Sequence, residues 1–182
     1  MNNFQFEDNF QERRRNEYAV VIFLPRELNS VVAPFREKYD PIYNLVDAHI
    51  TIVFPFDTTK SLEDISELIK METDNFKKVL IELDSIADFY PKTPVIYWEV
   101  KKNEALCEMY YRLYSRLGIP IPFKELIPHV TIAREISYHR VVTVKDAIVS
   151  YLPSENFHAA SIDLLTPLVN EKWVSVRSFS LK

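Results

Sequence analysis

Hydrophobic and polar positions follow two different spacings along this chain. Apolar runs rich in β-branched and aromatic residues predict strands over residues 18–24, 48–54, 79–89, 95–100, 127–133, 157–165 and 173–181. Apolar residues spaced three and four apart predict helices over 27–38, after a cap at Ser61, over 104–117 and after a cap at Thr143. Strands mixed with pairs of helices are typical of an α+β fold with mainly antiparallel sheet.

The order of these elements returns in the second half of the chain. His49 and His129 are 80 residues apart, and the two predicted helix caps, Ser61 and Thr143, are 82 residues apart. These offsets indicate an internal duplication, with halves of about 17–92 and 93–182 in one bilobal domain. We expect two pseudo-symmetric lobes of mainly antiparallel sheet, with helices packed outside and a central groove between the lobes.

The start of the chain departs from this pattern. Residues 1–16 are polar, contain the basic cluster "ERRRN" and lack the apolar core of a signal segment. We expect them to form a disordered, solvated tail. No apolar run approaches the ~20 residues needed to span a bilayer, so no membrane partner is expected. Cys107 is the single cysteine, which excludes a disulfide framework and favours a reducing, cytoplasmic setting.

Charge and glycine content narrow the function classes. The 182 residues carry a net charge of −4, which argues against a protein that coats long nucleic acid. Residues 93–182 hold 11 basic and 9 acidic side chains, against 11 and 17 in residues 1–92, so the second half is the better place for an anion site. Gly118 is the single glycine, which excludes a P-loop and a dinucleotide fingerprint. Side chains must therefore supply most of any phosphate site.

Two near-copies of one phrase stand out, "DAHITIVFPF" from residue 47 and "IPHVTIAR" from residue 127. Side chains alternate faces along a strand, so His49 and Thr51 share a face and lie ~7 Å apart, as do His129 and Thr131. The residues between them are apolar and face the opposite way. A twofold axis between the lobes would bring the two His-Thr faces together across the central groove.

Such a groove suits one kind of chemistry. Imidazoles have ordinary pKa values near ~6.5, so one can take a proton from water while the other gives a proton to a leaving oxygen. Two threonine hydroxyls can donate hydrogen bonds to the non-bridging oxygens of a phosphate. His49 and His129 are therefore the candidate catalytic residues, and Thr51 and Thr131 the candidate phosphate-binding residues. The set fits in-line hydrolysis of a phosphodiester with no cofactor.

Structural and metal-binding roles compete with the catalytic role of these residues. A single histidine on a half-exposed strand is usually structural, but two copies at a repeat-consistent offset favour a catalytic pair. A metal site is disfavoured, because neither phrase contains a thiolate or a carboxylate suited to complete a ligand set. Phe54 and Phe56 follow the first motif and are candidates for stacking a base. We expect surface or supporting roles for His139 and His158, and a core position for Trp98. We expect residues 90–94 and Lys124 to lie at the rim of the groove.

The residues His49-Ile50-Thr51-Ile52 and His129-Val130-Thr131-Ile132 resemble the paired His-x-Thr/Ser motifs of the 2H phosphoesterase superfamily. The Pro-His phrase that opens the second motif is similar to that of bacterial proteins labelled 2'-5' RNA ligase. The resemblance spans about 17–182 through element order, and its specific part is these eight residues. It implies hydrolysis of 2',3'-cyclic phosphates or 2'-5' linked oligonucleotides, or reversible 2'-5' ligation. It also makes Arg134 a candidate substrate-binding residue.

Two function classes remain open. The first is a metal-independent phosphodiesterase that acts on an RNA end or a small nucleotide by His/His acid-base catalysis. The second is a catalytically weak module that keeps the groove and binds a cyclic or 2'-linked nucleotide. Intact motifs in both predicted lobes favour the enzyme.

Overall fold

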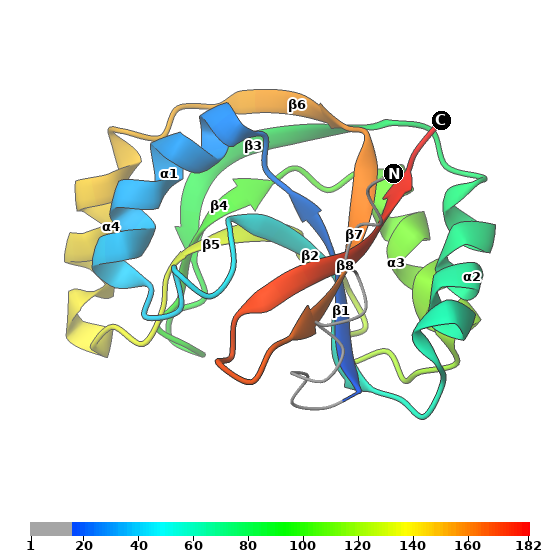
Figure 1. Ribbon diagram of the computed structural model, residues 1–182. Coiled ribbons are helices and arrows are strands. Elements are labelled where there is room, and N and C mark those ends of the chain that lie inside the picture. Colours follow the sequence, from blue (N-terminus) through cyan, green and yellow to red (C-terminus); the bar gives the residue numbers. More distant parts are fainter. Residues whose placement is uncertain (1–15) are drawn as a thin grey trace, which may run out of the picture.

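The computed structural model describes residues 16–182, so the predicted disordered tail lies outside the described residues except for Asn16. The described chain mixes helices with one eight-stranded sheet (Figure 1). The elements in chain order are β1 (Glu17–Phe23), α1 (Arg26–Tyr39), β2 (His49–Asp57), α2 (Leu62–Thr73), β3 (Val79–Asp88), β4 (Ile96–Val100), α3 (Glu104–Leu117), β5 (His129–Ala133), the 3₁₀ helix η2 (Tyr138–Arg140), α4 (Val141–Val149), β6 (Glu155–Ala159), β7 (Ser161–Pro167) and β8 (Trp173–Ser180).

The strand order of the sheet is symmetric about its centre. The order is β6-β3-β4-β5-β2-β1-β7-β8, and every pairing among the described residues is antiparallel. Reading it from the other end gives the same order if β1 is exchanged with β4, β2 with β5, β3 with β7 and β6 with β8. The predicted α+β class with mainly antiparallel sheet is confirmed, while the duplication of the two sequence halves stays a prediction.

The first half of the sequence gives β3 to the other lobe, and the second half gives β7 and β8. β3 pairs with β4 and β6, and β7 pairs with β1 and β8. The helices follow the same arrangement, since α1 packs on β5 and α4 on β3, while α2 and α3 pack together beside β8 and β2 (Figure 1). The lobes therefore interlock. None of the helices within residues 16–182 has the length and apolar character needed to cross a membrane.

Two predicted elements are wrong. The strand predicted over 157–165 is two strands, because the chain leaves one end of the sheet at Ala159, in β6, and enters the other lobe at Ser161, in β7. A continuous apolar run indicates that a segment is buried, but not that the chain passes from one lobe to the other within it. Thr143 does not cap a helix: η2 leads straight into α4, so the backbone is already helical at Arg140 and Thr143 lies inside the helix.

The cap predicted at Ser61 is confirmed. The Ser61 hydroxyl accepts a hydrogen bond from the Asp64 amide at 3.1 Å, and the Asp64 carboxylate accepts one from the Ser61 amide at 3.3 Å. This reciprocal capping box satisfies two amides that the first turn of α2 leaves without partners. Gly118 ends α3 in the left-handed conformation, with a φ of 69°.

The exposed residues Ser61 and Thr143 provide a matched pair for a stability test. Ser61→Ala should lower the free energy of unfolding by about 0.5–2 kcal/mol, because it removes the cap. Thr143→Ala should leave it unchanged or raise it slightly, since alanine has the higher helix propensity inside a helix. Urea unfolding at pH 7 measures both values. An equal loss in the two variants would contradict the capping assignment.

Candidate active site

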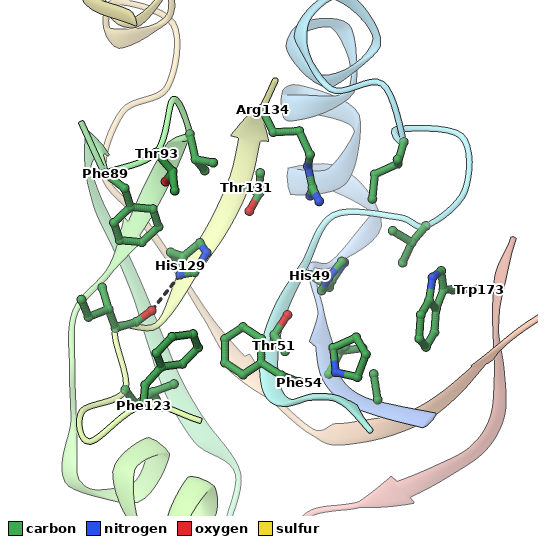
Figure 2. Close-up of a pocket in the computed structure, with 18 of the residues that line it drawn as sticks. His49, Thr51, Phe54, Phe89, Thr93, Phe123, His129, Thr131, Arg134 and Trp173 are labelled. Carbon is green, nitrogen blue, oxygen red and sulfur yellow. Dashed lines mark hydrogen bonds between the residues drawn. The ribbon is translucent and has the colours of Figure 1, made fainter. Parts of the chain in front are cut away.

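The two His-x-Thr phrases meet at the centre of the sheet. β2 and β5 are neighbouring antiparallel strands, and Ile50 pairs with Val130. This pairing brings His49, Thr51, His129 and Thr131 to one pocket with a volume of about 590 Å³, within the usual range for small-molecule sites (Figure 2). The intervening apolar side chains of both strands are fully buried on the opposite face, as the alternation predicted.

The two histidines are anchored in the same way. Nδ1 of His49 lies 2.7 Å from the carbonyl oxygen of Asp47, and Nδ1 of His129 lies 2.7 Å from the carbonyl oxygen of Ile127. A carbonyl oxygen only accepts, so Nδ1 must carry the proton in each ring. Nε2 is then the nitrogen that is left to exchange a proton with a bound molecule.

Burial shifts both imidazoles toward the neutral form. Loss of hydration lowers the pKa of His49 to about 4, and the positive charges of Arg36 and Arg134 act in the same direction. The hydrogen bond to the Asp47 carbonyl partly opposes this shift in pKa.

His129 has a more aromatic setting. The rings of Phe89 and Tyr97 each lie with their centroids 5.1 Å from that of the imidazole. Burial lowers the pKa of His129, with a smaller contribution from Arg134, while the bond to the Ile127 carbonyl opposes the shift. With no anion beside them, both histidines are therefore neutral near pH 7.

The walls of the pocket differ in chemistry. Phe54 and Phe123 meet edge to face, with ring centroids 5.2 Å apart, and Trp173 lies on the His49 side (Figure 2). The charged residues among the described lining are Arg134, Lys92 and Glu125. The pocket thus combines aromatic surfaces with two cationic side chains and one carboxylate.

The predicted aromatic residues have different positions. Phe54 lines the pocket, but Phe56 does not, and packs instead against Tyr18 with ring centroids 6.2 Å apart. In a regular strand Phe54 and Phe56 would share a face, but the pairing of β1 with β2 is irregular between Tyr18 and Val20 and changes the alternation. Trp98 is fully buried in the core, as expected.

The remaining sequence candidates lie outside the pocket or on its rim. His139 is exposed in η2 and His158 is exposed in β6, and neither lines the pocket. Lys92 and Thr93 do line it, in agreement with the predicted rim at residues 90–94, whereas Lys124 does not. The residues that sequence reasoning missed are the lining groups Phe89, Phe123, Glu125 and Trp173. Loop residues and isolated aromatics carry no periodic signal that would have identified them.

Metal-ligating side chains do not gather within the described part of the chain. No group of three or more His, Cys, Asp or Glu residues there is placed to hold a metal ion. The pocket instead offers two Nε2 atoms, two threonine hydroxyls and one guanidinium to a bound molecule (Figure 2). These groups are suited to hold a phosphate and move protons beside it.

Known structures share this fold. Crystal structures of LigT from E. coli with 3'-AMP and of TT0787 from Thermus thermophilus superpose with TM-scores of 0.66 and 0.64. The two structures are 16% and 17% identical to this chain, cover 92% and 91% of it, and are themselves covered over 98% and 97% of their lengths. The similarity establishes a shared fold over nearly the whole chain.

Sequence comparison gives the same family. A protein of Bacillus pumilus, provisionally named a phosphoesterase, is 27% identical over 169 residues, which are 91% of this chain and 97% of the relative. A relative from Geobacillus sp. strain WCH70 with the same provisional name is 29% identical over 171 residues, covering 90% and 95%. The family model described as "2'-5' RNA ligase superfamily" matches residues 24–170. The chain therefore belongs to the 2'-5' RNA ligase superfamily, the group of 2H phosphoesterases that its two His-x-Thr motifs resemble.

Proposed function

We propose that this protein is a metal-independent phosphodiesterase that acts on 2',3'-cyclic phosphates or 2'-5' linkages in RNA ends or small nucleotides. The observation that carries the proposal is the matched anchoring of His49 and His129. Each Nδ1 donates to a carbonyl two residues earlier, and both rings line one pocket with Thr51 and Thr131. Two equivalent Nε2 atoms beside two hydroxyl donors are suited to in-line phosphodiester hydrolysis.

The reaction divides between the two imidazoles. One neutral Nε2 takes a proton from water as the water oxygen attacks phosphorus. The other imidazole, protonated at Nε2, gives its proton to the leaving oxygen as the phosphorus–oxygen bond breaks. The threonine hydroxyls and Arg134 bind the non-bridging oxygens, whose negative charge increases in the transition state. Hydrolysis leaves the base protonated and the acid neutral, and proton exchange with solvent returns each ring to its starting state for the next substrate.

A bound substrate creates the difference in protonation between the two histidines. Both histidines are neutral near pH 7 with no anion beside them, because burial lowers both pKa values. A phosphate between them raises the pKa of each imidazole through its negative charge. One ring can then hold a proton, and repulsion between the rings keeps the other neutral.

Several observations support a small nucleotide as the substrate. The pocket volume of about 590 Å³ suits a molecule of that size, and Phe54, Phe123 and Trp173 provide aromatic surfaces for a base. LigT, which shares the fold, has been crystallised with 3'-AMP, ATP and NADP+. A cytoplasmic location stays a prediction.

Removal of either imidazole should abolish most activity. His49→Ala and His129→Ala should each lower kcat/KM by about 10²–10⁴, the usual contribution of one general acid or base. The double variant should lose much less than the product of the two losses, because both groups act on one transition state. The measurement uses a panel of 2',3'-cyclic nucleotides, 2'-5' dinucleotides and ADP-ribose cyclic phosphate.

His139→Ala and His158→Ala are the controls for these variants and should retain wild-type kcat/KM. A cost below about threefold for either motif histidine, together with an essential control histidine, would overturn the proposed catalytic pair. Binding of the panel compounds without any turnover would favour the alternative, a catalytically weak nucleotide-binding module.

Chelators should leave the rate unchanged. If imidazoles, hydroxyls and a guanidinium carry the reaction, a molar excess of EDTA over trace metals removes nothing that the transition state needs. Initial rates on the best panel substrate, with and without EDTA, measure this. Loss of activity that one added divalent ion restores would identify a metallohydrolase.

The lowered pKa of His49 should also appear in the stability of the protein. The unfolded chain titrates near ~6.5 and the folded one near 4, so the unfolded state binds more protons between these values and stability falls as the pH drops through this range. His49 should contribute about 1–2 kcal/mol of the loss between pH 7 and pH 5. His49→Gln should lose correspondingly less stability in urea unfolding at the two pH values. His158→Gln, at an exposed position, should match the wild type, and equal pH dependence in all three proteins would argue against a buried neutral His49.

A further inference from the structure

A buried carboxylate lies behind the pocket. Asp40 directly follows α1, and its side chain has no exposed surface. Its Oδ2 accepts hydrogen bonds from Nε and Nη2 of Arg36, at 3.2 and 3.0 Å. Its Oδ1 accepts a hydrogen bond from the Ile42 amide at 3.3 Å and lies 2.9 Å from Nε of Arg134. Both oxygens are therefore held in place, and Arg134 meets a carboxylate of fixed orientation.

Arg134 is tied twice to the end of α1. Its backbone amide donates to the carbonyl of Tyr39 at 3.0 Å, and its side chain pairs with Asp40. The next residue, Glu135, has a φ of 57°, so the chain turns sharply directly after Arg134. Strand alternation alone would turn Arg134 away from the face that carries His129 and Thr131. The contacts with α1 are what account for its position in the pocket.

The ion pair with Asp40 uses one nitrogen of the Arg134 guanidinium and leaves the other two available to a ligand. Nε of Arg134 faces Asp40, and within residues 16–182 no hydrogen bond or ion pair takes up Nη1 or Nη2. The guanidinium points into the pocket between Thr131 and His49 (Figure 2). Two adjacent N–H groups in a rigid plane match the oxygens of a phosphate.

The charges in this cluster have a definite balance. Arg36 and Arg134 are positive and Asp40 is negative, so the three side chains carry a net charge of +1 beside His49. Burial lowers the pKa of Arg134, and the negative charge of Asp40 is the largest influence that opposes the shift. Nε of Arg134 is buried and meets no acceptor at hydrogen-bond geometry, so its stabilisation depends on the charge of Asp40.

We propose that Asp40 is a positioning residue for phosphate binding. It holds Arg134 by Nε, so that Nη1 and Nη2 bind a phosphate oxygen between the two motif strands, and Arg36 offsets the remaining charge of Asp40. The effect on rate rests on the phosphodiesterase activity proposed above. The effect on phosphate affinity does not, and this difference lets the two proposals fail separately.

The chain contains a matched control. Glu72 of α2 is buried to the same degree as Asp40, with 3% and 2% of their surfaces exposed. It also pairs with two arginines, Arg112 and Arg116 of α3. None of these three residues lines the pocket. Glu72→Gln therefore removes a buried carboxylate charge, although from more exposed arginine partners, without touching the pocket.

The experiment measures the Kd of inorganic phosphate by isothermal titration, and kcat/KM on the best panel substrate. Asp40→Asn should weaken phosphate binding and lower kcat/KM, each by about 10- to 100-fold, because the guanidinium loses its orientation. Glu72→Gln should stay within about twofold of the wild type in both measurements, while its unfolding temperature falls because a buried charge pair is lost. Wild-type phosphate affinity in Asp40→Asn, or an equal loss in Glu72→Gln, would overturn the proposal.

A double variant tests whether Asp40 acts through Arg134. In an Arg134→Ala background, Asp40→Asn should add less than about threefold to either loss, because the group that it positions is absent. Full additivity would overturn the proposal. If no panel compound is turned over, the proposed phosphodiesterase function fails, and the phosphate Kd values still decide the role of Asp40.

Arg134→Lys covers the case in which Asp40→Asn does not fold. Lysine keeps the positive charge but has one nitrogen, which cannot pair with Asp40 and bind phosphate with a two-pronged geometry. We expect a loss of phosphate affinity close to that of Arg134→Ala. Wild-type affinity and rate in Arg134→Lys would show that charge alone suffices and would overturn the positioning role.

Discussion

The pairing of β2 with β5 is the constraint on which the rest of the structure depends. It joins residues 80 positions apart at Ile50 and Val130, in the centre of an eight-stranded sheet. Because side chains alternate along each strand, one register turns both His-Thr pairs to the pocket and both apolar sets to the core. A slip of one residue in either strand would bury a histidine under the helices and expose an isoleucine. Hydrophobic burial on one face therefore fixes the geometry of the other.

Anchoring of the imidazoles comes from the backbone just before each strand. The carbonyls of Asp47 and Ile127 fix Nδ1 as the protonated nitrogen, so the tautomer is set before any ligand arrives. The same burial that positions the rings also removes their hydration and lowers their pKa values. A site built in this way favours neutral imidazoles until a negative charge enters between them. The groups that the pocket offers to a bound molecule are side chains, and the single glycine, Gly118, lies at the end of α3 and not in the pocket.

The sequence predicted local features and the meeting of the two motifs, but not the other long-range contacts of the site. The strand faces of both motifs and the cap at Ser61 depend on neighbours within a few residues, and these predictions are confirmed. Phe56 leaves the pocket because of an irregular pairing with β1, which no pattern within β2 records. Thr143 has the composition of a cap, but the preceding 3₁₀ turn had already started the helix. Asp40 gave no signal at all, because its importance depends on Arg134, which is distant in sequence and adjacent in space.

The two halves of the site have equivalent motifs. They differ at the position five residues after each histidine. That position is Phe54 after His49 and Arg134 after His129, and both side chains line the pocket. One half thus places an aromatic ring, in contact with Phe123, where the other half places a guanidinium held by Asp40. A symmetric pair of imidazoles gives a phosphodiester no preferred direction. In the proposed function, the difference between Phe54 and Arg134 gives the substrate one preferred direction. The phosphate oxygens turn toward Arg134, and the base turns toward the aromatic pair. The attacking and leaving oxygens then face different histidines.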